Sequence, residues 1–90
     1  MTIEPIDYFF SSYRTGSISK YAAWEIEFIL GFPPNVEDDP DKVVNSWRFK
    51  VDGYECAIWD YKGSQHFNCW SIYDPHNVLG TLFRIDSKGF

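Results

Sequence analysis

The sequence predicts an α+β domain with two N-terminal helices, a three-stranded antiparallel β-meander and a C-terminal helix. Three observations predict this class: apolar residues at helical spacing in the first third of the chain, two tight-turn signals between strand-like runs in the middle, and an Asp-Pro start signal before an apolar stripe near the end. The 90 residues suffice for a single domain, 1–90, and an aromatic content of 20% supplies large rings for its core.

Residues 4–13 form the first predicted helix, because Pro5 suits a first helical position and the apolar residues after it have helical spacing. Residues 18–30 form the second, with two apolar stripes and few polar positions. The stripes are Tyr21, Trp24 and Phe28 on one side and Ile18, Ala22, Ile26 and Ile29 on the other. A helix this apolar must be covered on most of its sides. Gly31 and the proline pair at 33–34 end it.

The turn signals Asp52-Gly53 and Gly63-Ser64 predict strands over 44–52, 54–62 and 65–73. Two-residue turns would pair Val51 with Tyr54, Phe49 with Cys56 and Trp47 with Ile58, then Ile58 with Cys69 and Ala57 with Trp70. Because side chains alternate across a strand, this register sorts them onto two faces. One face collects Trp47, Phe49, Val51, Tyr54, Cys56, Ile58, Phe67 and Cys69. The other collects Arg48, Lys50, Glu55, Ala57, Trp59, Tyr61, His66, Asn68, Trp70 and Ile72.

We expect the N-terminal helices to cover the first of these faces. The last predicted helix, 75–84, follows the pair Asp74-Pro75, which fits an N-cap and a first helical residue. Its apolar stripe consists of Val78, Leu79, Leu82 and Phe83, and Gly80 weakens it by about 1 kcal/mol relative to alanine.

The net charge of −5 is unevenly distributed. Residues 1–41 hold eight acids and two bases, which gives −6, whereas residues 42–90 hold five acids and six bases, which gives +1. Free duplex DNA is an unfavourable partner for such a chain, because non-specific binding to DNA depends on basic side chains. A partner protein with a basic surface fits better. The chain has no apolar run long enough for a membrane span and no secretory leader, so we expect no membrane partner and a cytoplasmic location.

Two candidate binding surfaces follow from these patterns. The first is a partner-binding surface of acids that steer association and rings that supply affinity: Glu37, Asp38, Asp39 and Asp41 with Trp59, Tyr61 and Trp70. The second is an alternative small-ligand site that would stack a nucleotide base on rings beside cations: Arg48, Lys50, Trp59, Tyr61, His66 and Trp70. The same residues also have simpler interpretations. The acids would form a solvated loop, and the tryptophans would belong to the core or the aromatic face would form a homodimer interface.

The residue types of metal and catalytic sites are present, but not in productive patterns. Cys56, His66, Cys69 and His76 lack the spacing of two close ligand pairs, so we expect no metal site. The two cysteines share a face in the predicted register and are expected to be free thiols. Neither a nucleophile beside a base nor a phosphate-binding loop is apparent. We therefore expect a protein that is not an enzyme and has no cofactor.

The run DDPDKVVNSWRFKVDGYECAIWDYKGS, followed by CWSIYDPHNVLGTLF, resembles a pattern of small uncharacterised proteins encoded by tailed bacteriophages. The resemblance covers about residues 36–83, and its motifs describe a hairpin and caps rather than an active site. Small acidic phage proteins without catalytic motifs resemble, as a class, inhibitors of host enzymes and defence systems, including CRISPR complexes. The resemblance therefore implies an accessory protein that binds a host protein or nucleoprotein complex and inhibits it by occupying its surface.

Overall fold

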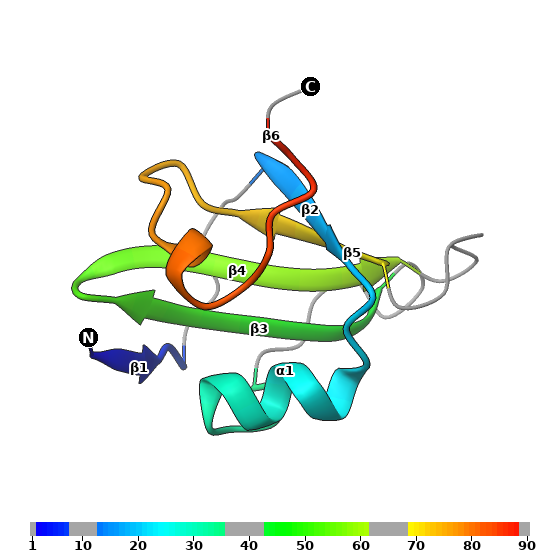
Figure 1. The fold of residues 1–90 in the computed structure, drawn as a ribbon. Coiled ribbons are helices and arrows are strands. Elements are labelled where there is room, and N and C mark those ends of the chain that lie inside the picture. The colour runs from blue at the N-terminus through cyan, green and yellow to red at the C-terminus, as the bar shows by residue number, and fades with distance from the viewer. Residues whose placement is uncertain (1, 8–12, 36–42, 62–68, 89–90) are drawn as a thin grey trace.

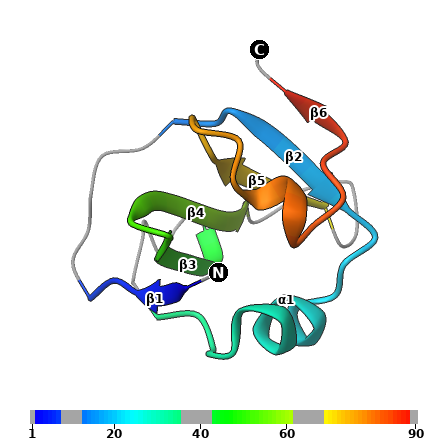
Figure 2. The ribbon, with the colours of Figure 1, turned by 60° about the vertical axis from the view of Figure 1, so that its left-hand side comes forward.

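The computed structural model describes residues 2–7, 13–35, 43–61 and 69–88 and shows an antiparallel sheet with one α-helix in this part of the chain. The elements are β1 (Ile3–Pro5), β2 (Gly16–Ser19), α1 (Ala23–Leu30), β3 (Val43–Val51), β4 (Tyr54–Tyr61), β5 (Cys69–Tyr73), the 3-10 turn η1 (Leu79–Thr81) and β6 (Ser87–Lys88). The strand order is β1-β3-β4-β5-β2-β6. The sheet curves, and α1 and η1 lie on the same side of it (Figures 1 and 2).

This mostly β architecture shows that the predicted α+β class, with two N-terminal helices and a C-terminal helix, is wrong. Residues 3–5 form β1 and pair with β3 instead of starting a helix. Ile18 and Ser19 belong to β2, so the helix predicted over 18–30 shortens to α1, and the segment 75–84 contains only η1. Short apolar runs can form either a helix or a strand. Here they form strands because they pair with the edges of β3 and β5.

The hairpin of β3 and β4 has the predicted register. Asp52 and Gly53 have φ of 51° and 88°, the positive values that a type I′ turn needs. The predicted pairs are confirmed: Val51 with Tyr54, Phe49 with Cys56 and Trp47 with Ile58. A two-residue turn allows only one pairing register, so the register of this hairpin is set by the residues of the turn.

The pairing of β4 with β5 is shifted by three residues from the prediction. Ile58 lies opposite Ile72, not Cys69, and Trp59 lies opposite Ser71. A shift by an odd number of residues exchanges the faces of a strand, so Trp70 moves to the face of Ile58. The predicted turn at Gly63-Ser64 lies outside the described residues. On its other side β5 pairs with β2, in the register Gly16 with Ile72, Ile18 with Trp70 and Ser19 with Cys69.

The core lies between one face of the sheet, here called the core face, and the layer formed by α1 and η1. Its fully buried members include Trp47, Phe49, Cys56, Ile58 and Ile72 from the strands. From the other layer it takes Ile26, Leu30, Leu79 and Phe83. Trp47 and Trp70 meet edge to face at its centre, with ring centroids 5.5 Å apart. One aromatic pair therefore joins the middle of β3 to β5.

The opposite, outer face carries a second and smaller buried cluster of Ala57 and Trp59, against which Tyr73 packs. The guanidinium of Arg48 lies over the ring of Trp59 at 6.0 Å, and Arg48 is fully buried. At this distance a cation interacts favourably with the ring face. The outer face is thus packed around Trp59, which matches the interpretation that the tryptophans belong to the core.

Candidate functional site

Two tryptophan indoles fix both ends of α1. Trp70 Nε1–H donates to the carbonyl of Tyr21 at 2.7 Å, just before the helix begins. Trp47 Nε1–H donates to the carbonyl of Phe32 at 3.0 Å, just after it ends. Both indoles are buried in the core, where hydrogen bonds are protected from water. The position of α1 is therefore set by two side chains of the sheet.

The ends of α1 are also closed by local contacts. The Glu25 carboxylate accepts the backbone N–H of Ala22 at 2.9 Å, which places a negative charge at the positive end of the helix. At the other end, Gly31 adopts a left-handed φ of 91° and donates its N–H to the carbonyl of Glu27 at 2.7 Å. Glycine favours this conformation, so the predicted end of the helix is confirmed.

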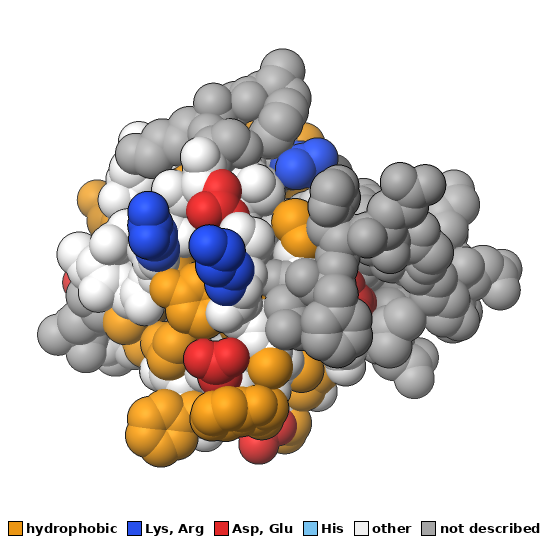
Figure 3. Space-filling model, turned by 45° about the vertical axis from the view of Figure 1, so that its right-hand side comes forward, with side chains coloured by type: hydrophobic (Ala, Val, Ile, Leu, Met, Phe, Trp, Pro, Cys, Tyr) orange, Lys and Arg blue, Asp and Glu red, His pale blue; other side chains and the backbone are white. Residues whose placement is uncertain are grey.

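The outward side of α1 carries two exposed aromatic residues, Trp24 and Phe28, here called the aromatic pair. They are 71% and 83% exposed. They are four positions apart and therefore lie on the same helix face, one turn from each other. Together they present roughly 300 Å² of apolar surface, given that large aromatic residues have 150–250 Å² each to bury. Figure 3 shows hydrophobic side chains gathered at one edge of the molecule, beside acidic ones.

The expectation that this helix is covered on most sides is wrong, because only the side of Ile26 and Leu30 is buried. Sequence reasoning assigned the aromatic pair to a core stripe and missed its exposure. One signal was available: a helix with two apolar stripes has more apolar surface than one face of a small sheet can cover. The largest exposed apolar patch of a typical monomer is about 300–600 Å² and is often functional, so the aromatic pair is a candidate binding surface.

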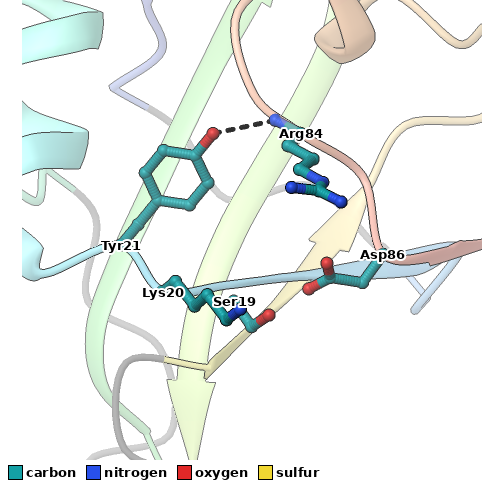
Figure 4. A pocket seen from close by; sticks show the side chains of 5 residues that line it. All are labelled: Ser19, Lys20, Tyr21, Arg84 and Asp86. Atoms are coloured by element: carbon teal, nitrogen blue, oxygen red, sulfur yellow. Dashed lines mark hydrogen bonds between the residues drawn. The ribbon is translucent and has the colours of Figure 1, made fainter.

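A pocket of about 380 Å³ lies next to the start of α1. It is lined by Ser19, Lys20, Tyr21, Arg84 and Asp86. Figure 4 shows these side chains around one space, with the Tyr21 hydroxyl accepting the Arg84 backbone N–H at 2.8 Å. Lys20 and Arg84 are 64 positions apart and no motif joins them, so the sequence alone does not predict this pocket.

In the described structure, the predicted rings and cations do not share one exposed face of the sheet. Trp59 and Trp70 lie on opposite faces, and each is only 4% exposed. Arg48 is fully buried and Lys50 is half-buried. No ring of this set presents its face to a ligand in the described structure, so the geometry gives no support to nucleotide stacking at Trp59 and Trp70.

The remaining predicted site residues fall beyond what the structure describes. Glu37, Asp38, Asp39, Asp41 and His66 lie outside the described residues, and for Tyr61 only the backbone, which pairs with Val43, is described. The acidic docking segment therefore remains a prediction.

The cysteines offer no reactive site in the described structure. Cys56 is on the core face and Cys69 on the outer face, so the predicted shared face is wrong, and both are free thiols. Burial and, to a lesser extent, the charge of Asp74 together raise the pKa of the Cys56 thiol from 9.0 to about 12. The thiol stays protonated at neutral pH and cannot act there as a nucleophile. Among the described residues, no group of three His, Cys, Asp or Glu side chains could hold a metal ion.

The one α-helix of the described residues, α1, is too short to cross a membrane, and no other described segment forms a long apolar helix. In comparisons with protein families, curated proteins and solved structures, no match to this chain is found.

Proposed function

We propose that the chain is a non-catalytic protein-binding domain that docks α1 against a partner protein, with the aromatic pair at the centre of the interface. The observation that supports this is the exposure of Trp24 and Phe28 on a helix whose two ends are held by Trp70 and Trp47. Buried aromatic anchors supply much of the affinity of protein interfaces. A helix that is already fixed loses little conformational freedom on binding.

The charges beside the aromatic pair favour a partner with a basic rim. Glu27 is exposed on one flank of the pair and Glu25 lies half-buried on the other, and α1 itself has no basic residue. A symmetric antiparallel pairing of α1 with a second copy would bring each glutamate close to its own counterpart, and like charges repel. We therefore favour a different protein that offers an apolar pocket surrounded by Lys or Arg.

The size of the aromatic pair implies further contacts. A standard interface buries about 800 Å² on each partner, and the pair supplies less than half of this. The acidic segment with Glu37, Asp38, Asp39 and Asp41 would extend the interface and steer association with a basic surface. The resemblance of residues 36–83 to small phage proteins favours a host protein or nucleoprotein complex, such as a defence complex in the bacterial cytoplasm, as the partner and inhibition as the result.

The test compares partner capture by matched variants. Tagged wild-type chain, the double variant Trp24→Ser/Phe28→Ser and the control Tyr13→Ser/Tyr54→Ser are incubated with bacterial host lysate, and retained proteins are identified by mass spectrometry. The control also removes two exposed rings, from residues 64% and 46% exposed. We expect one stoichiometric partner with the wild type and the control, and its loss with the double variant.

Two results would contradict the proposal. Equal capture by the double variant would exclude α1 as the docking element. Sedimentation of the wild type as a dimer, with return to a monomer in Trp24→Ser/Phe28→Ser, would show that the pair binds a second copy instead.

A further inference from the structure

We propose that the pocket beside the start of α1 binds a small hydroxylated acid, whose oxyanion lies between Lys20 and Arg84 and whose hydroxyl group meets Asp86. This site is separate from the aromatic pair and does not depend on the proposed partner. The oxyanion is a phosphate or a carboxylate, because both offer the same negative oxygens to the two cations.

The pocket is open to solvent on one side and has the size of a small-molecule site. Its volume of about 380 Å³ lies in the range that such ligands occupy, roughly 300–1,000 Å³. The ring of Tyr21 packs edge to face on Phe83, with centroids 5.3 Å apart, and its carbonyl accepts the Trp70 indole N–H. On the opposite wall, the Asp86 backbone N–H donates to the Ser17 carbonyl at 2.9 Å. Only the ends of the charged side chains must order when a ligand binds.

The pocket concentrates positive charge on an acidic protein. The chain has a net charge of −5, yet two cations and one acid line this pocket, which gives a local charge of +1. Lys20 and Arg84 are exposed, and in the described structure neither has a side-chain ion pair. Their charges therefore remain available for an anion.

The backbone at Lys20 supports a role for its side chain. Its φ is 68°, in the left-handed region that glycine adopts without cost and other residues adopt at about 1 kcal/mol or more. Glycine would therefore be the more stable choice at this position if only the fold mattered. A lysine that the fold does not need, at the edge of a pocket, points to a function in binding.

The hydrogen-bonding groups of the pocket define the class of ligand. The Tyr21 hydroxyl accepts the Arg84 N–H, so its own proton can be donated to a ligand oxygen, and Ser19 offers a second hydroxyl. Asp86 is an acceptor when ionised and therefore requires a donor on the ligand. Inorganic phosphate supplies the negative oxygens but fills a small part of the volume. A sugar phosphate or a hydroxycarboxylate supplies both the anion and the hydroxyl.

The experiment is an NMR titration of the ¹⁵N-labelled full chain with ribose 5-phosphate and, separately, with citrate. We expect saturable shifts at the backbone amides of Lys20, Tyr21, Arg84 and Asp86, with a Kd of about 1 mM or tighter for at least one acid. Saturation by ribose 5-phosphate alone would assign the phosphate, and saturation by citrate alone the carboxylate. No saturable shift with either acid, or equal shifts with uncharged ribose, would overturn the proposal.

Matched variants separate binding from folding. Lys20→Gln and Arg84→Gln are expected to raise the Kd about tenfold or more, because each removes a charge-assisted hydrogen bond, while Lys50→Gln on the outer face leaves it unchanged. Lys20→Gly is expected to bind as weakly as Lys20→Gln with an equal or higher melting temperature. Wild-type affinity in Lys20→Gly would overturn the proposal. Trp24→Ser/Phe28→Ser should keep the acid site, so the two proposals can fail independently.

Discussion

Asp74 holds the segment that carries one wall of the pocket, and its replacement by alanine should destabilise the fold. Its carboxylate accepts the N–H of Val78 at 2.8 Å and the N–H of Leu79 at 3.0 Å, and the residue is 6% exposed. The segment that follows places Leu79 and Phe83 in the core and Arg84 at the pocket. The prediction that Asp74 is the N-cap of a helix over 75–84 is wrong, because that helix does not form, and the carboxylate instead accepts the N–H groups of Val78 and Leu79, where η1 begins.

The cost of Asp74→Ala follows from the two lost hydrogen bonds. Hydrogen bonds to a charged group contribute about 1.5–3 kcal/mol each, and losing a helix cap costs about 0.5–2 kcal/mol. The two bonds share one carboxylate, so we expect a loss of about 3 kcal/mol in the free energy of unfolding. A domain of this length is stable by roughly 5–13 kcal/mol in total. The melting temperature should fall by about 12–24 °C.

Urea unfolding, followed by tryptophan fluorescence and circular dichroism, measures this change. Asp74→Asn keeps one acceptor oxygen and should lose about half as much stability, whereas Asp86→Ala, at an exposed aspartate, should change it by less than about 0.5 kcal/mol. The denaturant dependence should not change between variants. An Asp74→Ala variant within 0.5 kcal/mol of the wild type would refute the reasoning.

Side-chain hydrogen bonds of Asn35 and Trp70 hold the sheet and α1, and the buried thiol of Cys56 gives the stability a pH dependence. Asn35→Ala should lower the free energy of unfolding by about 2–3 kcal/mol. The Asn35 side chain donates to the carbonyls of Ile6 and Arg48 at 2.9 Å and accepts the N–H of Arg48 in β3. An unchanged midpoint of urea unfolding would contradict this prediction. Trp70→Phe should lower the free energy of unfolding by about 1–3 kcal/mol, because the Tyr21 carbonyl loses its hydrogen-bond donor. Amide hydrogen exchange at the start of α1 should then become faster, and exchange at the wild-type rate would argue against this prediction. Cys56, with its pKa raised from 9.0 to about 12, favours the folded state fully below pH 9, and this contribution is lost as the pH rises toward 12. Cys56→Ala should flatten the pH dependence of unfolding in that window, and an identical alkaline profile would count against the assignment.

The parts of the fold that the sequence predicts are those set by local chemistry. The Asp52-Gly53 turn determines the register of β3 and β4, and Gly31 ends α1. The strands β1 and β2 could not be recognised in this way. They are three and four residues long, and their pairing partners, β3 and β5, are distant in the sequence. Their strand conformation is stabilised by those partners and not by their own residues.

The dependence of strand pairing on distant partners also explains why the predicted binding face around Trp59 and Trp70 is wrong. The two-residue turn assumed at Gly63-Ser64 placed Trp70 beside Trp59, whereas the observed register places Trp70 in the core, beside Trp47. From there the two core indoles reach the carbonyls on either side of α1. Trp47 and Trp70 thus support the surface on which Trp24 and Phe28 are exposed. Substitutions at the core pair should reduce stability and binding together, whereas substitutions at the exposed pair should reduce binding and leave stability nearly unchanged.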